Sequence, residues 1–154
     1  MNDIKNFYLN IKTDQNLPTF EWVMNADSDD LEHSHIWCQR AFPNFEPSEM
    51  VPGAPVLDQE TLNYIKENHG EQVLMLAFRY LNHYNSLFAR EFSHNNRRVT
   101  RLIKFLVMLE YKEAAKSVYS MCIKVHKEAF EANDSVIYWL EALNYTRNNN
   151  DNPQ

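Results

Sequence analysis

The chain has few of the residues that break helices or cross-link small folds. Only 2 of its 154 residues are Gly and only 2 are Cys. Scarce Gly argues against a β fold rich in tight turns. Because Cys38 and Cys122 are the only cysteines in the sequence, a disulfide scaffold is not expected, and free thiols fit a reducing compartment.

Long apolar segments and an excess of positive charge are also missing. The longest apolar run, residues 73–78, is far too short to cross a bilayer. Residues 1–4 do not have the basic and apolar regions of a signal peptide. The net charge of -6 disfavours a nucleic acid polymer as partner, because such binding needs a basic face. We therefore expect a cytoplasmic protein with no membrane contact.

Apolar residues at helical spacing are the dominant pattern. Hydrophobic residues make up 44% of the chain and aromatic residues 13%. Their spacing predicts an all-α fold, a single compact domain of about six to seven helices over residues 1–147, followed by a disordered tail at 148–154. The helical segments are predicted at residues 3–12, 19–24, 31–41, 58–70, 71–88, 95–110, 111–130 and from 134 onward.

One stretch cannot be helical. Residues 43–57 contain four prolines and Gly53, and proline removes a backbone donor and clashes with the preceding turn. The prolines are Pro43, Pro47, Pro52 and Pro55. We expect an extended loop, which is either a pocket wall or a plain connector.

The segment that starts at Phe92 is the most informative for function. Asn95 and Asn96 are suited to cap a helix, and an apolar stripe begins directly behind them at Val99. Cations occupy the other face, at i, i+4, i+7 spacing: His94, Arg98 and Arg101, and also Arg97, Arg101 and Lys104. Positive charge in the first turns opposes the helix dipole, so helix stability does not require it. The pattern predicts an anion-binding corner, unless these arginines pair with the chain's own carboxylates.

A second polar group, Glu32 to His35, follows the acidic segment 27–30. Histidines at i and i+2 point to different sides of a helix, so this group does not have the spacing of a metal site. No metal and no cofactor are expected.

The run His94-Asn95-Asn96 with Arg98 and Thr100-Arg101 resembles the signature of the opioid growth factor receptor conserved domain. The stretch from Leu31 through His35 and Gln39 to Phe42-Pro43 is similar to the second motif of that family. The resemblance implies an all-helical, non-enzymatic domain; the receptor that gives the family its name binds an opioid pentapeptide. Three positions depart from the family: Cys38 and Arg40 stand where Ile and Trp are usual, and Tyr111 where Gly is usual.

The first functional hypothesis is a binding protein for a small anionic, nucleotide-like ligand of the phosphate or ADP-ribose type, for sensing or sequestration. In a phage, this would be a sponge for an immune signal, an anti-defence role. The arginine forks suit phosphate, and an aromatic ring would stack a base. The ligand-binding residues expected are His94, Asn95, Asn96, Arg98, Arg101, His35, Gln39, Arg40, Trp37 and Phe42.

Three other interpretations stay open. The same basic helix could dock an acidic or peptide segment of a partner protein, as the family resemblance would suggest. A second alternative is an enzyme. It is not expected, because no P-loop, nucleophile elbow or zinc-hydrolase motif is present. In a purely structural interpretation, the asparagines cap the helix, the arginines pair internally, and His35 is an interior histidine.

Overall fold

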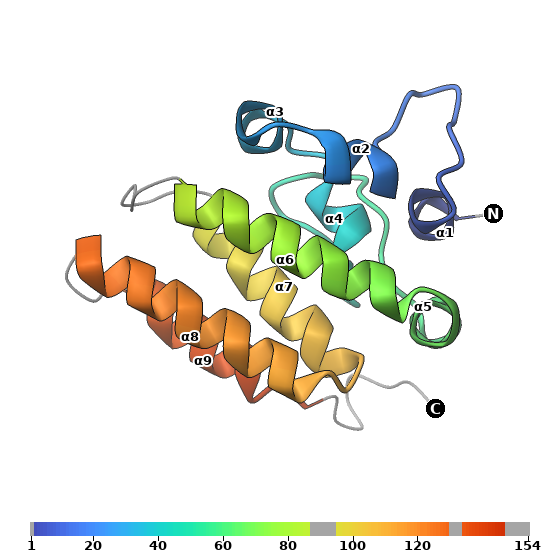
Figure 1. Ribbon diagram of the computed structural model, residues 1–154. Helices are drawn as coiled ribbons and strands as arrows, with labels where there is room; N and C mark the ends of the chain where they lie inside the picture. Colours follow the sequence, from blue (N-terminus) through green and yellow to red (C-terminus); the bar gives the residue numbers. More distant parts are fainter. Residues whose placement is uncertain (1, 87–94, 130–133, 147–154) are drawn as a thin grey trace. The chain divides into compact units, whose positions relative to one another are not determined.

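The computed structural model describes residues 2–86, 95–129 and 134–146 (Figure 1). These residues form nine α-helices and no strand, which confirms the all-α prediction. Nine is more than the about six to seven helices predicted for the domain, and one more than the eight segments that the apolar spacing marks. The helices are α1 (Asp3–Tyr8), α2 (Phe20–Asn25), α3 (Ser28–His33), α4 (Cys38–Ala41), α5 (Gln59–Asn68), α6 (Gly70–Ser86), α7 (Asn95–Met108), α8 (Lys112–Ala129) and α9 (Asp134–Leu143).

Contacts divide the chain into two compact units. Unit 1 comprises Met1–Phe88 and contains α1 to α6, and unit 2 comprises Ala89–Gln154 and contains α7 to α9. Each unit is described by itself below. That residues 1–147 form one domain stays a prediction, and the predicted tail at 148–154 lies outside the described residues.

Four helices of unit 1 begin at a side-chain cap. The cap residues are Asn2, Thr19, Asp27 and Asp58, and each accepts a hydrogen bond from the backbone N–H three residues later. Such caps satisfy a donor that the first turn leaves open, and each contributes about 1 kcal/mol. Because α1, α2 and α3 have only six residues each, this contribution is large relative to their few internal hydrogen bonds.

The first helix ends earlier than its sequence pattern predicts, at Tyr8 instead of residue 12. Asn10 adopts a left-handed conformation with φ of 58°, and the N–H of Ile11 donates to the carbonyl of Asn6 at 2.9 Å. This hydrogen bond closes the helix in the manner of a Schellman motif, in which Asn is one of the residues that tolerates positive φ.

The single helix predicted over residues 31–41 is wrong, because the structure has α3 and α4 separated by residues 34–37. The side chain of Trp37 explains the break. Its indole N–H donates to the backbone carbonyl of Leu31 at 3.1 Å, which is the acceptor that a continuing helix would offer to residue 35. Burying the indole with its N–H hydrogen-bonded stabilises the fold more than four further residues of helix would.

Trp37 also organises the core of unit 1. Its ring lies 5.8 Å from that of Tyr80 and 6.1 Å from that of Phe42, and the Phe42 and Tyr80 rings are 6.4 Å apart. Residues 43–57 then run without helix, as their prolines predict. Leu57 returns this loop to the core, and its N–H donates to the carbonyl of Asn44 at 2.8 Å.

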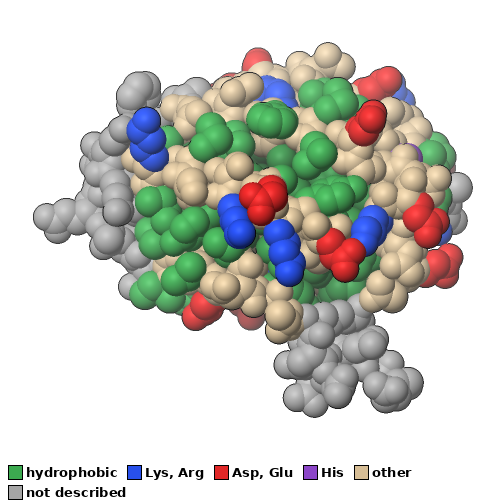
Figure 2. Space-filling model, turned by 60° about the horizontal axis from the view of Figure 1, so that its bottom comes forward, with side chains coloured by type: hydrophobic (Ala, Val, Ile, Leu, Met, Phe, Trp, Pro, Cys, Tyr) green, Lys and Arg blue, Asp and Glu red, His purple; other side chains and the backbone are tan. Residues whose placement is uncertain are grey.

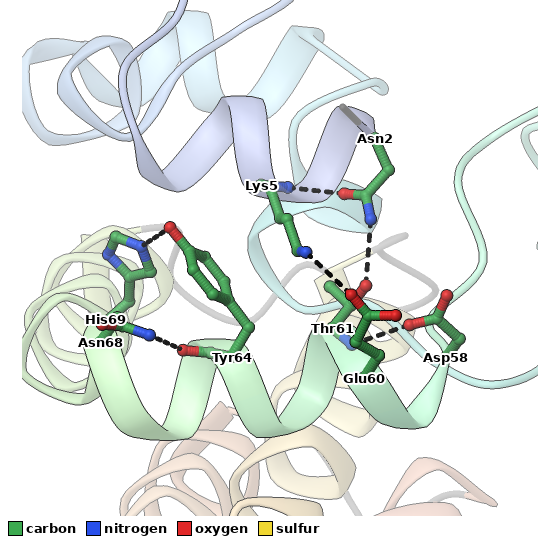
Figure 3. Close-up of polar contacts among 8 residues, drawn as sticks. All are labelled: Asn2, Lys5, Asp58, Glu60, Thr61, Tyr64, Asn68 and His69. Atoms are coloured by element: carbon green, nitrogen blue, oxygen red, sulfur yellow. Dashed lines mark hydrogen bonds and ion pairs between the residues drawn. The ribbon is translucent and has the colours of Figure 1, made fainter.

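Helices α1 and α5 are joined by polar contacts drawn in Figure 3. The Asn2 amide donates to the Thr61 hydroxyl at 3.0 Å, and the Lys5 ammonium lies 3.5 Å from the carboxylate of Glu60. The same ammonium is 4.8 Å from the centre of the Tyr64 ring. These contacts fix the short α1 helix to the longer α5.

Unit 2 consists of α7 packed against α8 and α9. Helix α7 ends at a Schellman-type cap, in which the N–H of Tyr111 donates to the carbonyl of Leu106 at 2.9 Å. Glu110 occupies the left-handed position with φ of 67°, where glycine is most common. None of the helices in the described parts of either unit is long and apolar enough to cross a membrane.

The cap at Asp58 generates a prediction about pH. Hydrogen bonds from the Thr61 side chain and backbone hold the pKa of the Asp58 carboxyl below its usual value. A lowered folded-state pKa stabilises the fold above the unfolded-state pKa, and this stabilisation is lost as pH falls through the folded-state pKa. We expect Asp58→Ala to cost about 1 kcal/mol at pH 7.

Urea unfolding of wild type and Asp58→Ala at pH 7 and near pH 2.5 measures this loss. The difference between the two proteins should shrink at the lower pH. Asp58→Asn is the matched control, because it keeps a cap oxygen without the charge and should lose much less stability at pH 7. A difference that does not change with pH would show that the Asp58 charge has no role in the cap.

Candidate functional site

The predicted organising helix exists, and it begins close to where the sequence places it. Helix α7 starts at Asn95 and ends at Met108, against a prediction of 95–110. Its first turn contains no acidic residue, and the cations at 97, 98, 101 and 104 are the charged residues of the whole helix. His94, the first predicted ligand-binding residue, lies outside the described residues.

The four cations of α7 do not have equivalent environments. Arg98 is 6% exposed, and its guanidinium donates to the side-chain oxygen of Asn95 at 3.4 Å. Asn95 itself is fully buried. The two residues are therefore a buried pair that organises the start of the helix, with little surface for a ligand.

The other three cations form an outward-facing row, which we call the cationic row: Arg97, Arg101 and Lys104. Their i, i+4, i+7 spacing places them on one side of α7, away from the buried stripe. Arg97 is exposed, and Arg101 and Lys104 are half-buried. The Lys104 ammonium lies 4.4 Å from the centre of the Tyr145 ring, a cation–π contact.

Two contacts show how α9 lies against α7. The Trp139 indole N–H, in the middle of α9, donates to the backbone carbonyl of Asn96 at the start of α7, at 2.9 Å. Lys104 and Tyr145, near the other end, are also in contact. The two helices therefore run in the same direction, and Tyr145, two residues past the end of α9, borders the cationic row at Lys104.

The second predicted set of residues lies in unit 1. His35 is exposed, whereas Gln39 and Arg40 are buried on the short helix α4. The Arg40 guanidinium donates to the carbonyl of Ile36 at 2.7 Å and lies 3.4 Å from the carboxylate of Asp3. Its Nε and the side-chain oxygen of Gln39 are buried without a hydrogen-bond partner in the described structure.

Trp37 and Phe42, the rings predicted to stack a ligand, are both 0% exposed. They pack on each other and on Tyr80 in the core of unit 1, so neither presents a ring face to solvent. The stacking role conflicts with this burial. An aromatic residue that sequence reasoning missed is Tyr145, whose ring lies 4.4 Å from the Lys104 ammonium in unit 2. Tyr145 lies 41 positions after Lys104 in the sequence, so the sequence gives no signal of their proximity.

The structure also locates the polar groups that an enzyme or a metal site would use. His83 is fully buried, and its Nε2 lies 3.3 Å from a carboxylate oxygen of Glu32. Both thiols are buried, and burial raises the pKa of the Cys122 thiol to about 12, so little nucleophilic thiolate forms. No group of three or more His, Cys, Asp or Glu residues in the described ranges is placed to hold a metal ion.

Figure 2 shows one face of the molecule in space-filling form. Hydrophobic side chains gather there in several clusters, and Lys and Arg alternate with Asp and Glu between them.

Comparison with known proteins finds no matching family model, no matching curated protein and no matching solved structure. The resemblance to the opioid growth factor receptor domain therefore rests on the motif residues alone.

The different environments of adjacent arginines generate a prediction. Arg98→Ala should lower the free energy of unfolding by about 1–3 kcal/mol, because it leaves the buried Asn95 amide without this donor. Arg97→Ala removes an exposed cation and should change stability by less than about 0.5 kcal/mol. Urea unfolding of both variants measures the difference. Equal losses would contradict the assignment of Arg98 to structure and Arg97 to the surface.

Proposed function

We propose that the chain is a non-enzymatic binding protein, in which the basic helix start of α7 holds a small phosphate-bearing ligand of nucleotide type, for sensing or sequestration. The observation that carries this proposal is the cationic row, three cations on one side of a helix that has no acidic residue. Arg97 lies in the first turn of α7, where a cation destabilises a helix by about 0.3–1 kcal/mol at low ionic strength. A bound anion removes that penalty.

The chemistry of the row suits phosphate more than a single carboxylate. A guanidinium presents donors in a planar fork, and Arg97 and Arg101 are one helical turn apart. Two such groups can reach different oxygens of one phosphate. Each charge-assisted hydrogen bond contributes about 1.5–3 kcal/mol, so two or three support roughly millimolar binding of phosphate alone once the cost of immobilisation is included.

Sequestration or sensing is favoured over catalysis by the groups near the row. In unit 2, the one cysteine, Cys122, is buried on α8 and is therefore not available to solvent as a nucleophile. A phosphoryl-transfer enzyme would need a base or a metal beside the anion. The site would therefore bind its ligand unchanged.

A second candidate function is a protein-interaction module. The observation in its favour is the apolar surface of α9, where Ile137 is 56% exposed and Leu140 47% exposed. These residues are three positions apart and lie on one side of the helix. In this alternative, the cationic row would contact an acidic segment of the partner at the edge of the apolar contact.

The test of the first proposal is thermal unfolding at low salt with inorganic phosphate, pyrophosphate and a nucleotide panel. Ligand at about a hundred times its dissociation constant should stabilise the fold by roughly 2.7 kcal/mol. Arg97→Ala should reduce the shift at least several-fold while leaving the unliganded melting temperature unchanged. Lys124→Ala, which removes an exposed cation from α8, is the matched control and should bind like wild type.

A flat response to the whole panel at 10 mM, with no anion released from the purified protein on heating, would contradict the proposal. In that case, strongly salt-dependent binding of an acidic peptide would favour the interaction module. A shift that Arg97→Ala and Lys124→Ala reduce equally would show a general charge effect and no site at the row.

A further inference from the structure

The cationic row is long compared with a single phosphate. An α-helix advances about 1.5 Å along its axis per residue, so the row from Arg97 to Lys104 extends over about 10 Å, with Arg101 between them. The two arginines, one turn apart, are sufficient to contact one phosphate. Lys104 lies nearly one further turn along the helix, so the row continues beyond that phosphate.

The contact between Lys104 and Tyr145 holds the far end of the row in place. The Lys104 ammonium lies 4.4 Å from the centre of the Tyr145 ring. Helix α9 contacts the start of α7 through Trp139, and Tyr145 follows in the same direction, so its ring lies at the Lys104 end of the row. A cation–π contact leaves the charge of the ammonium in place, and the ammonium has three donors. Lys104 is therefore a contact point for an anion that is displaced along α7 from the two arginines.

The charge of the row also exceeds that of one phosphate. A phosphate monoester carries a charge of about −1.5 to −2 at pH 7. The row carries three positive charges, and the sequence of α7 contains no acidic residue. A second phosphate linked to the first adds negative charge and length together. A linear chain of phosphates therefore matches the row in both properties.

We propose that the ligand of the cationic row carries at least two linked phosphates, as a nucleoside diphosphate does, with one phosphate on Arg97 and Arg101 and the next on Lys104. This inference rests on the proposed function, because it needs an anion to occupy the row. It narrows the class of ligand, since the site then binds a diphosphate or a longer linear phosphate chain in preference to a monophosphate. Lys104 is the residue that distinguishes the two.

The test compares ligands that differ by one phosphate: AMP with ADP, and inorganic phosphate with pyrophosphate. Their dissociation constants are measured at one low ionic strength and without divalent metal ions. One further charge-assisted hydrogen bond corresponds to on the order of tenfold in a dissociation constant, so wild type should bind ADP and pyrophosphate about tenfold tighter than AMP and phosphate. Lys104→Met should remove most of both preferences and leave AMP and phosphate nearly unchanged. Methionine keeps an unbranched side chain on the Tyr145 ring, so this variant retains the packing.

Lys124→Met is the matched control, because it removes an exposed cation from α8 and should keep both preferences. Arg97→Ala should weaken the binding of all four ligands. Circular dichroism checks that each variant is folded.

Three results would contradict the inference. Equal affinity of wild type for the monophosphates and the diphosphates, with all four weakened in Arg97→Ala, would overturn it and leave the proposed function standing. A preference for the diphosphates that Lys104→Met and Lys124→Met reduce equally, or that neither reduces, would be a general charge effect and would also overturn it. A wild type that binds none of the four ligands would overturn both the inference and the proposed function.

Discussion

The apolar stripe of α7 is the constraint on which unit 2 depends. Val99, Leu102, Ile103 and Leu106 are all fully buried, and Phe105 joins them. Burying each such side chain contributes about 1.5–3 kcal/mol, several times the penalty of a cation in the first turn. The stripe therefore sets the rotation of the helix. Once that rotation is fixed, the opposite side of the helix faces outward, and this side carries residues 97, 101 and 104. The position of the cationic row is therefore a consequence of hydrophobic burial.

Unit 1 is stabilised by different interactions, namely side-chain caps and an aromatic cluster. Its first four helices have between four and six residues, lengths at which an isolated helix does not form in water. Side-chain caps and the aromatic cluster of Trp37, Phe42 and Tyr80 compensate. The Trp37 indole is central because it both fills the core and supplies the donor that ends α3. Because the Trp37 ring is buried in the core, it presents no face to a ligand.

The sequence predicted most of the helices because their apolar periodicity is strong. The α7 prediction was correct at its start and two residues too long at its end, since nothing in the pattern announces that Glu110 adopts a left-handed conformation. The helix predicted over 31–41 failed because periodicity does not show that a tryptophan side chain can hydrogen-bond the backbone carbonyl six residues before it.

The candidate site was predictable in part. Its cations lie on one helix, so their spacing alone indicated a shared face. Which of them is buried was not predictable, because Arg97 and Arg98 are adjacent and chemically identical, and only the direction of the stripe separates them. The aromatic residue beside the cations was not predictable from the sequence for another reason. Tyr145 meets Lys104 through the packing of unit 2, a contact between distant parts of the sequence.

The position of Trp139 has an optical consequence. It is the one tryptophan of unit 2, since Trp22 and Trp37 belong to unit 1, and its indole is held against the first turn of α7. In a protein whose Trp22 and Trp37 are replaced by Phe, the emission of unit 2 would come from a single fluorophore beside Tyr138 and the cationic row. The fluorescence of Trp139 would then report the environment at the start of α7 without any added label.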